Sequence, residues 1–267
     1  DYFSGVYRIG GPGSYWPTVL GCYLNFALPW ALCVYLLVKN PNLRFLVILV
    51  VVMLIAALGA TLSRSALIGF AVSVIILYSH VSRTRQWRFL LVLGGGLAAL
   101  LLFPSFLERM LLIAPETVGK IEFSRPLFWE RSLALLDQGL RFITGIGMGH
   151  SFHLVFRNQP VSMLDARFHQ LPHAHNLIIH YLIIWGLPGL LAYLWFTGCY
   201  LSSLLSSFRA NRWPAGQWIQ WVAVAALAGF WVEELFHVSV LYRNNMTFYW
   251  LTLAAGLAVG RLCSQPP

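Results

Sequence analysis

Seven apolar stretches, each close to 20 residues long, constrain the fold of this chain more than any other feature of its sequence. They lie at residues 17–38, 44–62, 64–79, 88–106, 187–207, 217–237 and 246–262. A helix of about 20 apolar residues spans the hydrocarbon core of a bilayer, which is about 30 Å thick. With 58% hydrophobic and 10% charged residues over 267 positions, and a mean hydropathy of +0.70, the chain is too apolar for a water-soluble domain. We therefore expect an all-α, polytopic helical bundle with about seven transmembrane helices.

Lysine and arginine are distributed unequally between the two sides of these expected spans. One side receives eight basic residues and no Asp or Glu, whereas the other receives the remaining ten basic residues and all nine acidic ones. The residues on the acid-free side are Lys39, Arg44, Arg83, Arg85, Arg88, Arg209, Arg212 and Arg261. The positive-inside rule makes this side cytoplasmic. The net charge of +9 is thus explained by membrane topology and gives no argument for nucleic-acid binding.

The cysteines and the first residues bear on domain organisation. Cys22, Cys33, Cys199 and Cys263 lie in or beside apolar stretches and form no CxxC pair, so the sequence predicts neither a zinc site nor a disulfide framework. The first residues are polar and show no signal-peptide pattern. We expect residues 1–267 to form a single membrane domain that is the C-terminal part of a longer protein.

One loop, at residues 107–174, is much longer than the others and is expected on the external side. Loops of this length are usually functional, and six of the eight histidines fall between residues 150 and 180. The sequence predicts a short helix at 107–114, a turn at 115–120, an amphipathic helix at 126–140 and a glycine-rich turn at 145–149. The glycines of that turn are not a nucleotide-binding fingerprint, because no strand precedes them.

The apolar run that follows this loop, residues 177–205, is too long for one simple crossing. Its 29 residues would form a helix of about 44 Å, against about 30 Å of hydrocarbon. Either its first three turns stand above the lipid, or the helix breaks at the Gly-Leu-Pro-Gly sequence of residues 186–189. Both alternatives place His175 near the external membrane surface.

The run begins with a motif: His175 and Asn176, nine residues, Gly186, two residues and Gly189. In a continuous helix, eleven residues make about three turns, so His175 and Gly186 would project from nearly the same face. Small residues there would let a helix or lipid chain approach closely. Alternatively, His175 and Asn176 cap the helix and the glycines serve packing. Spacing alone leaves both interpretations open.

This motif, placed after a long external loop, resembles the signature of the O-antigen ligase superfamily. Ser63-Arg64 at a helix boundary and the segment from Arg125 to the glycines at 145–149 are also similar to that family. The superfamily includes O-antigen polymerases and protein O-oligosaccharyltransferases. The resemblance implies a GT-C-like membrane glycosyltransferase of the bacterial inner membrane that needs no metal or cofactor. It would move a glycan from undecaprenyl diphosphate to an acceptor hydroxyl, expected to be on lipid A-core, at the periplasmic face.

The residue types fit that chemistry. A neutral imidazole can remove the proton of an attacking hydroxyl, and we assign this role to His175. Guanidinium groups bind diphosphate in a bidentate manner, and Arg64 and Arg125 are the first candidates for this clamp. An arginine at a helix end can also simply reach the lipid headgroups. The expected substrate-binding residues are Arg131, Arg8, His173, Asn176, Gly186 and Gly189.

Other polar residues are weaker candidates. His173 and His175 suggest a metal site, but no carboxylate or thiol lies at ligand spacing, so we expect His173 to support the site and no metal to bind. Arg131 could instead pair with Glu130 or Asp137. Glu233, Glu234 and His237, near the external end of the sixth span, could line an acceptor channel or lie at the membrane interface.

Two rival functions use the same residues differently. A polymerase would share the donor and extend a lipid-linked glycan. An anion transporter would bind a moving anion with its arginines and relay protons through His175, but transporters commonly show internal repeats and sites near the bilayer midplane. No repeat is evident here, and the polar residues gather on one side. A purely structural subunit would explain neither the long loop nor its histidines.

Overall fold

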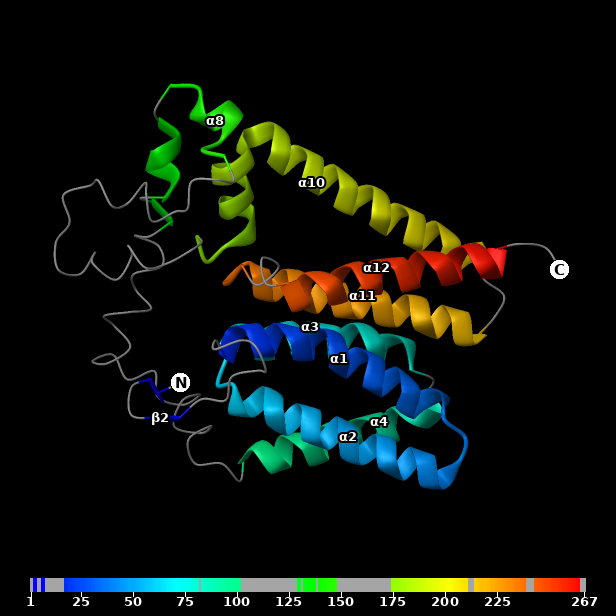
Figure 1. Cartoon of the computed structure of the whole chain (residues 1–267). Coiled ribbons are helices and arrows are strands. Elements are labelled where there is room, and N and C mark those ends of the chain that lie inside the picture. Colours follow the sequence, from blue (N-terminus) through cyan, green and yellow to red (C-terminus); the bar gives the residue numbers. More distant parts are fainter. Residues whose placement is uncertain are drawn as a thin grey trace. The chain divides into compact units, whose positions relative to one another are not determined.

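The computed structural model describes residues 2–3, 6–7, 17–81, 83–101, 129–130, 132–137, 139–147, 174–210, 214–238 and 243–264. Within this part the chain is helical, apart from the two-residue antiparallel strands β1 (Tyr2–Phe3) and β2 (Val6–Tyr7). The long helices are α1 (Pro17–Leu37), α2 (Pro41–Ala60), α3 (Arg64–His80), α4 (Arg83–Leu101), α10 (Leu177–Ala210), α11 (Pro214–Glu234) and α12 (Arg243–Ser264) (Figure 1). The all-helical class is confirmed, and a long helix lies at each predicted span.

Three of these helices are long and apolar enough to cross a membrane, judged by length and composition over the described residues. They are α1, α2 and α10 over Leu177–Phe208. On α2, Met53 is 70% exposed and Phe45 is 62% exposed. Large apolar side chains exposed along a whole helix face are unfavourable in water and suit lipid. The chain is therefore an integral membrane protein.

The chain divides into two compact units. The first unit comprises Asp1–Ile113, Tyr200–Glu233 and Ser239–Pro267, and the second comprises Ala114–Cys199 and Glu234–Val238. The second unit thus includes five residues that directly follow the part of α11 belonging to the first unit.

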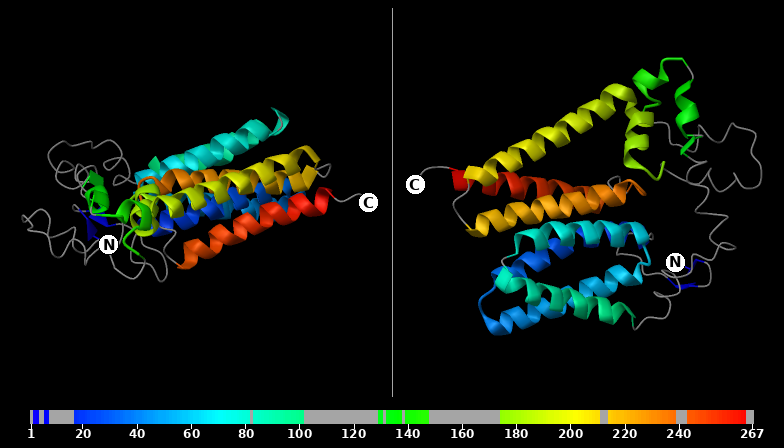
Figure 2. Two further views of the ribbon diagram at one scale, coloured as in Figure 1. Left: turned by 90° about the horizontal axis from the view of Figure 1, so that it is seen from above. Right: turned by 180° about the vertical axis from the view of Figure 1, so that it is seen from behind.

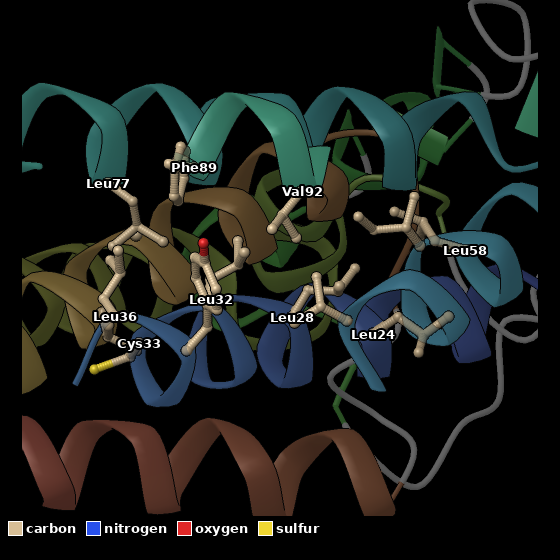
Figure 3. Close-up of a cluster of buried hydrophobic side chains, with 14 of the residues drawn as sticks. Leu24, Leu28, Leu32, Cys33, Leu36, Leu58, Leu77, Phe89 and Val92 are labelled. Carbon is tan, nitrogen blue, oxygen red and sulfur yellow. The ribbon is translucent and has the colours of Figure 1, made fainter. Parts of the chain in front are cut away.

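The core of the first unit is built around α1, which packs against α2, α3 and α12, while α2 also packs against α4. Helices α1 to α4 run alongside one another in both views of Figure 2. Leu24, Leu28 and Leu32 recur every four residues and so lie on one face of α1, where they meet a buried cluster that includes Leu58 and Phe89 (Figure 3). Lipid is as apolar as leucine, so close packing rather than escape from water stabilises this core.

Small residues bring α3 against α11. Ser65, Gly69 and Ser73 are spaced by four along α3 and are buried. A Cβ on Gly69 would collide with the carbonyl oxygen of Gly229, and the Ser73 hydroxyl donates to the Ala225 carbonyl over 2.8 Å. This small-residue packing is typical of membrane helix pairs. It holds α3, whose first residue is Arg64, at a fixed position beside α11.

The second unit contains the described part of the long loop. Residues 129–130 and 132–134 are helical, followed by the 3₁₀ helix η1 (Leu135–Asp137) and the short helix α8 (Arg141–Thr144). Leu135 and Leu136 pack with Ile183 and Ile184 of α10. The amphipathic helix predicted at 126–140 is thus helical where it is described, up to Asp137. The helix and turn predicted at 107–114 and 115–120 lie outside the described residues.

Helix α10 breaks at Gly186, where φ is 67° and ψ is −174°. Figure 1 shows α8 beside this bend. The carbonyls of Ile183 and Ile184, which lose helical partners at the break, accept hydrogen bonds from Ile146 N (2.8 Å) and Gly147 N (3.0 Å). Of the two alternatives for the long apolar run, the structure therefore has the broken helix. The glycine-rich turn is confirmed at residues 145–147, the part of it that is described.

The predicted alignment of His175 and Gly186 on one helix face is wrong. His175 precedes the first residue of α10, Leu177, and has a φ of 52°. Since Gly186 also interrupts the helix, the two residues do not project from one face of a continuous helix.

Candidate functional site

His175 lies in the short connection that leads into α10. Its φ of 52° is in the left-handed region, which costs a non-glycine residue about 1–2 kcal/mol. The preceding residue, Ala174, is fully buried, and its carbonyl accepts a hydrogen bond from Trp129 Nε1 over 3.0 Å. The helical segment that contains Trp129 therefore fixes the backbone on the N-terminal side of His175. The His175 side chain is half-buried.

Asn176 fixes the backbone on the C-terminal side of His175. Its Oδ1 accepts a hydrogen bond from Ile179 N over 3.0 Å, which makes Asn176 the N-cap of α10. Its Nδ2 donates to the Leu235 carbonyl over 2.9 Å. One side chain thus starts the helix and ties the motif to the segment after α11. The capping interpretation is confirmed for Asn176, and its contact with substrate stays a prediction.

His237, two residues beyond Leu235, lies against His175. The two ring centroids are 5.5 Å apart, and the ring planes meet at 73°, an edge-to-face arrangement. His237 is 5% exposed. The sequence marked His237 as a polar residue near a helix end but gave no reason to pair it with His175, because no spacing pattern links them.

Gly186 and Gly189 pack against protein. A Cβ on Gly186 would collide with the Ile143 carbonyl and lie 2.8 Å from Gly145 N. A Cβ on Gly189 would collide with the Cβ of Trp185, one turn earlier in α10. The packing interpretation of these glycines therefore agrees with the structure. Their role in substrate binding stays a prediction.

Arg64 belongs to the first unit and is the first residue of α3. The turn before it is tightly built: Leu62 has a φ of 51°, and the Ser63 side chain caps α3 by accepting from Ala66 N over 3.4 Å. The half-buried Arg64 side chain therefore adds its positive charge to the positive end of the helix dipole. Such an arrangement favours a bound anion.

A buried polar cluster lies near the start of α3 in the same unit. Asn25, which is 0% exposed, donates from Nδ2 to Glu233 Oε2 over 2.6 Å and to the Ala66 carbonyl over 3.1 Å. A Cβ on Gly21 would lie 3.4 Å from Glu233 Oε1 and 3.7 Å from the Cβ of Ser63. Gly21 thus lies next to both the Glu233 carboxyl and Ser63, the residue that precedes Arg64.

The sequence interpretation missed Asn25, although an amide inside the apolar stretch 17–38 is a signal of function or of a buried partner. It left open whether Glu233 and Glu234 line a channel or lie at the membrane interface. In the structure Glu233 is 0% exposed and Glu234 is 1% exposed, so both are buried in protein.

Several predicted residues are not among those described. Arg125, Arg131, Arg8 and His173 lie outside the described residues. Within the described part of the chain, no group of three or more His, Cys, Asp or Glu could hold a metal ion. Because His173 is not included, independence from metal stays a prediction.

No curated protein matches this chain. A family model described as O-antigen ligase matches residues 26–194. The matched region runs from α1 through the break in α10 and contains both Arg64 and His175. Because the match covers more than half of the sequence, this chain belongs to the O-antigen ligase family, whose members are ligase- or polymerase-type glycosyltransferases.

Proposed function

We propose that this protein transfers a glycan from undecaprenyl diphosphate to a hydroxyl of lipid A-core, with His175 as the general base. The observation that carries this proposal is the support of His175. Its backbone is held between the Trp129–Ala174 hydrogen bond and the Asn176–Leu235 hydrogen bond, in a region matched by the O-antigen ligase family. Such fixed geometry is what a general base needs to meet a bound hydroxyl.

The reaction follows from these groups. The acceptor oxygen attacks the anomeric carbon, and the bond from that carbon to the diphosphate oxygen breaks. The hydroxyl proton passes to the His175 imidazole, and undecaprenyl diphosphate leaves with the electron pair. Arg64 and Arg125 neutralise the charge that develops on the leaving group. The position of Arg64 at the N-terminus of α3 supports this role, because the helix dipole acts in the same direction.

The proposal includes a topology. The seven long helices cross the inner membrane, residues 107–174 form a periplasmic catalytic loop, and residues 1–267 form one membrane domain. Support comes from the long helix at each apolar stretch and from the acid-free side, which carries eight basic residues. Accessibility of single cysteines at residues 141 and 44 to a membrane-impermeant reagent tests it. Labelling of position 141 but not 44 in intact spheroplasts is the expected result.

The decisive experiment is transfer in vitro from purified undecaprenyl diphosphate glycan to lipid A-core, with and without chelator. His175→Ala should lower the rate by about 10²-fold or more, as expected for loss of a general base. His80→Ala is the matched control, because His80 is an exposed histidine of α3 that stacks on Trp221 in the first unit. Full activity of His175→Ala would overturn the assignment of the base, and activity that vanished with chelator would overturn metal independence.

The acceptor is tested in the same preparation and in cells. Elongation of the lipid-linked donor, without transfer to lipid A-core, would identify a polymerase. In cells that lack the native enzyme, loss of every capped core band indicates a ligase, and a single-repeat cap indicates a polymerase. Uptake of a labelled anion into proteoliposomes with no glycan transfer would overturn the enzymatic function altogether.

A further inference from the structure

We infer that His237 is a positioning residue: its ring holds the imidazole of the base, His175, in the orientation needed for proton transfer. This inference rests on the proposed role of His175. Its starting point is the edge-to-face contact of the two rings, with centroids 5.5 Å apart and planes at 73°. Aromatic rings prefer this geometry, because the positive edge of one ring faces the negative face of the other.

His237 is itself held rigidly. It lies in the segment Glu234–Val238, which belongs to the same compact unit as His175. Glu234 is 1% exposed, His237 is 5% exposed and Val238 is 0% exposed, so the segment is buried at both ends. The Leu235 carbonyl accepts from Asn176 Nδ2 over 2.9 Å, which ties this segment to the residue next to His175. A ring anchored in this way can serve as a fixed support.

His175 needs such a support. Its φ of 52° fixes the backbone, but its side chain is only half-buried. The χ2 angle of histidine has a broad distribution, so the backbone alone does not determine the ring plane. Misplacement of a reacting group by about 1 Å can cost about 10²-fold in rate. The edge-to-face contact with His237 restrains the plane of the His175 ring.

The test compares His237→Ala with His237→Phe in the transfer assay. Phenylalanine retains an aromatic ring, and alanine removes it. We expect His237→Ala to lower kcat by about tenfold or more without changing KM for either substrate, and His237→Phe to recover most of the lost rate. Tyr193→Leu is the matched control, because it removes another edge-to-face ring pair of the second unit, Tyr181–Tyr193, at 4.6 Å. That variant should show unchanged kcat, and thermal unfolding checks that all variants are folded.

A second measurement reports the chemical accessibility of the His175 ring and does not depend on catalysis. Carbethoxylation of His175 by diethyl pyrocarbonate, followed by mass spectrometry, should be faster in His237→Ala than in the wild type and in His237→Phe. Equal rates in all three proteins would overturn the inference. So would recovery of kcat by His237→Gln but not by His237→Phe, since the nitrogen rather than the ring would then be needed. Failure of the proposed function is a separate result, namely retained transfer by His175→Ala.

Discussion

Gly145 and Gly186 adopt the same backbone conformation and lie in direct contact. Their φ angles are 68° and 67°, and both have a ψ of −174°. A Cβ on Gly145 would lie 2.6 Å from Gly186 N, and a Cβ on Gly186 would lie 2.8 Å from Gly145 N. Only glycine commonly adopts this region of φ and ψ. The break in α10 is therefore a packed junction with the end of α8. This junction determines where the first segment of α10 ends.

Gly186→Ala should destabilise the folded protein. The strained backbone conformation alone costs about 1–3 kcal/mol, and the new Cβ would also collide with the Ile143 carbonyl. We expect a lower midpoint of thermal unfolding in detergent and a loss of transfer activity, because the contact between Gly145 and Gly186 holds α8 against α10.

Two glycines serve as controls for this variant. Gly198, in the same helix, has nothing within 4 Å of its Cβ position, so Gly198→Ala should leave the midpoint unchanged or raise it. Gly139 has a φ of 59° and equally open space, so Gly139→Ala measures the backbone strain without the collision. A midpoint for Gly186→Ala equal to that of Gly198→Ala would contradict the junction.

Asn176 combines two functions that substitutions can separate. Asn176→Asp retains the side-chain oxygen that caps α10 but loses the donor to the Leu235 carbonyl, whereas Asn176→Ala loses both. We expect the alanine variant to be less stable than the aspartate variant by about 1 kcal/mol, which is the usual worth of an N-cap. Both should lower kcat, because both release the segment that carries His237.

The control for the cap is Asn40→Ala at the start of α2, where Asn40 Oδ1 accepts from Asn42 N over 2.9 Å. That variant should lose stability and keep its kcat. If Asn176→Asp kept the full kcat, the hydrogen bond to Leu235 would have no part in catalysis.

Asn25 and Glu233 should show energetic coupling. Asn25→Leu removes the amide that donates to the buried carboxyl, which should destabilise the protein by about 1.5–3 kcal/mol. The double variant with Glu233→Leu should be less destabilised than the sum of the single variants, because the shared interaction is lost in each. Unfolding in denaturant measures all three proteins. The control is Ser73→Ala, which removes a hydrogen bond to Ala225 of α11; its effect on the free energy of unfolding should be additive with that of Glu233→Leu. If the effects of Asn25→Leu and Glu233→Leu were additive, the two residues would not interact.

A feature of the fold or of the candidate site could be predicted from the sequence when residues close together in the chain determine it. The helices could be predicted from apolar runs, because membrane spans depend on length and hydropathy. The break in α10 was one of two alternatives, since Gly186 and Pro188 are local helix breakers. Contacts such as His175 with His237 and Asn25 with Glu233 could not be predicted. They join segments far apart in the sequence, and only the packing of the helices brings them together.

Arg64 should contribute to donor binding, because its proposed partner is the donor diphosphate. Arg64→Ala should lower kcat/KM for the donor by about ten- to a hundredfold, the worth of a charged hydrogen bond. Arg64→Lys should recover only part of this loss, because lysine keeps the charge but not the bidentate fork. The control is Arg44→Ala, since Arg44 caps the end of α1 by donating to the Val38 carbonyl over 2.6 Å and lies on the side predicted to be cytoplasmic. Transfer kinetics at varied donor concentration measure all three variants. If Arg64→Ala and Arg44→Ala gave the same kcat/KM for the donor, Arg64 would not bind the diphosphate.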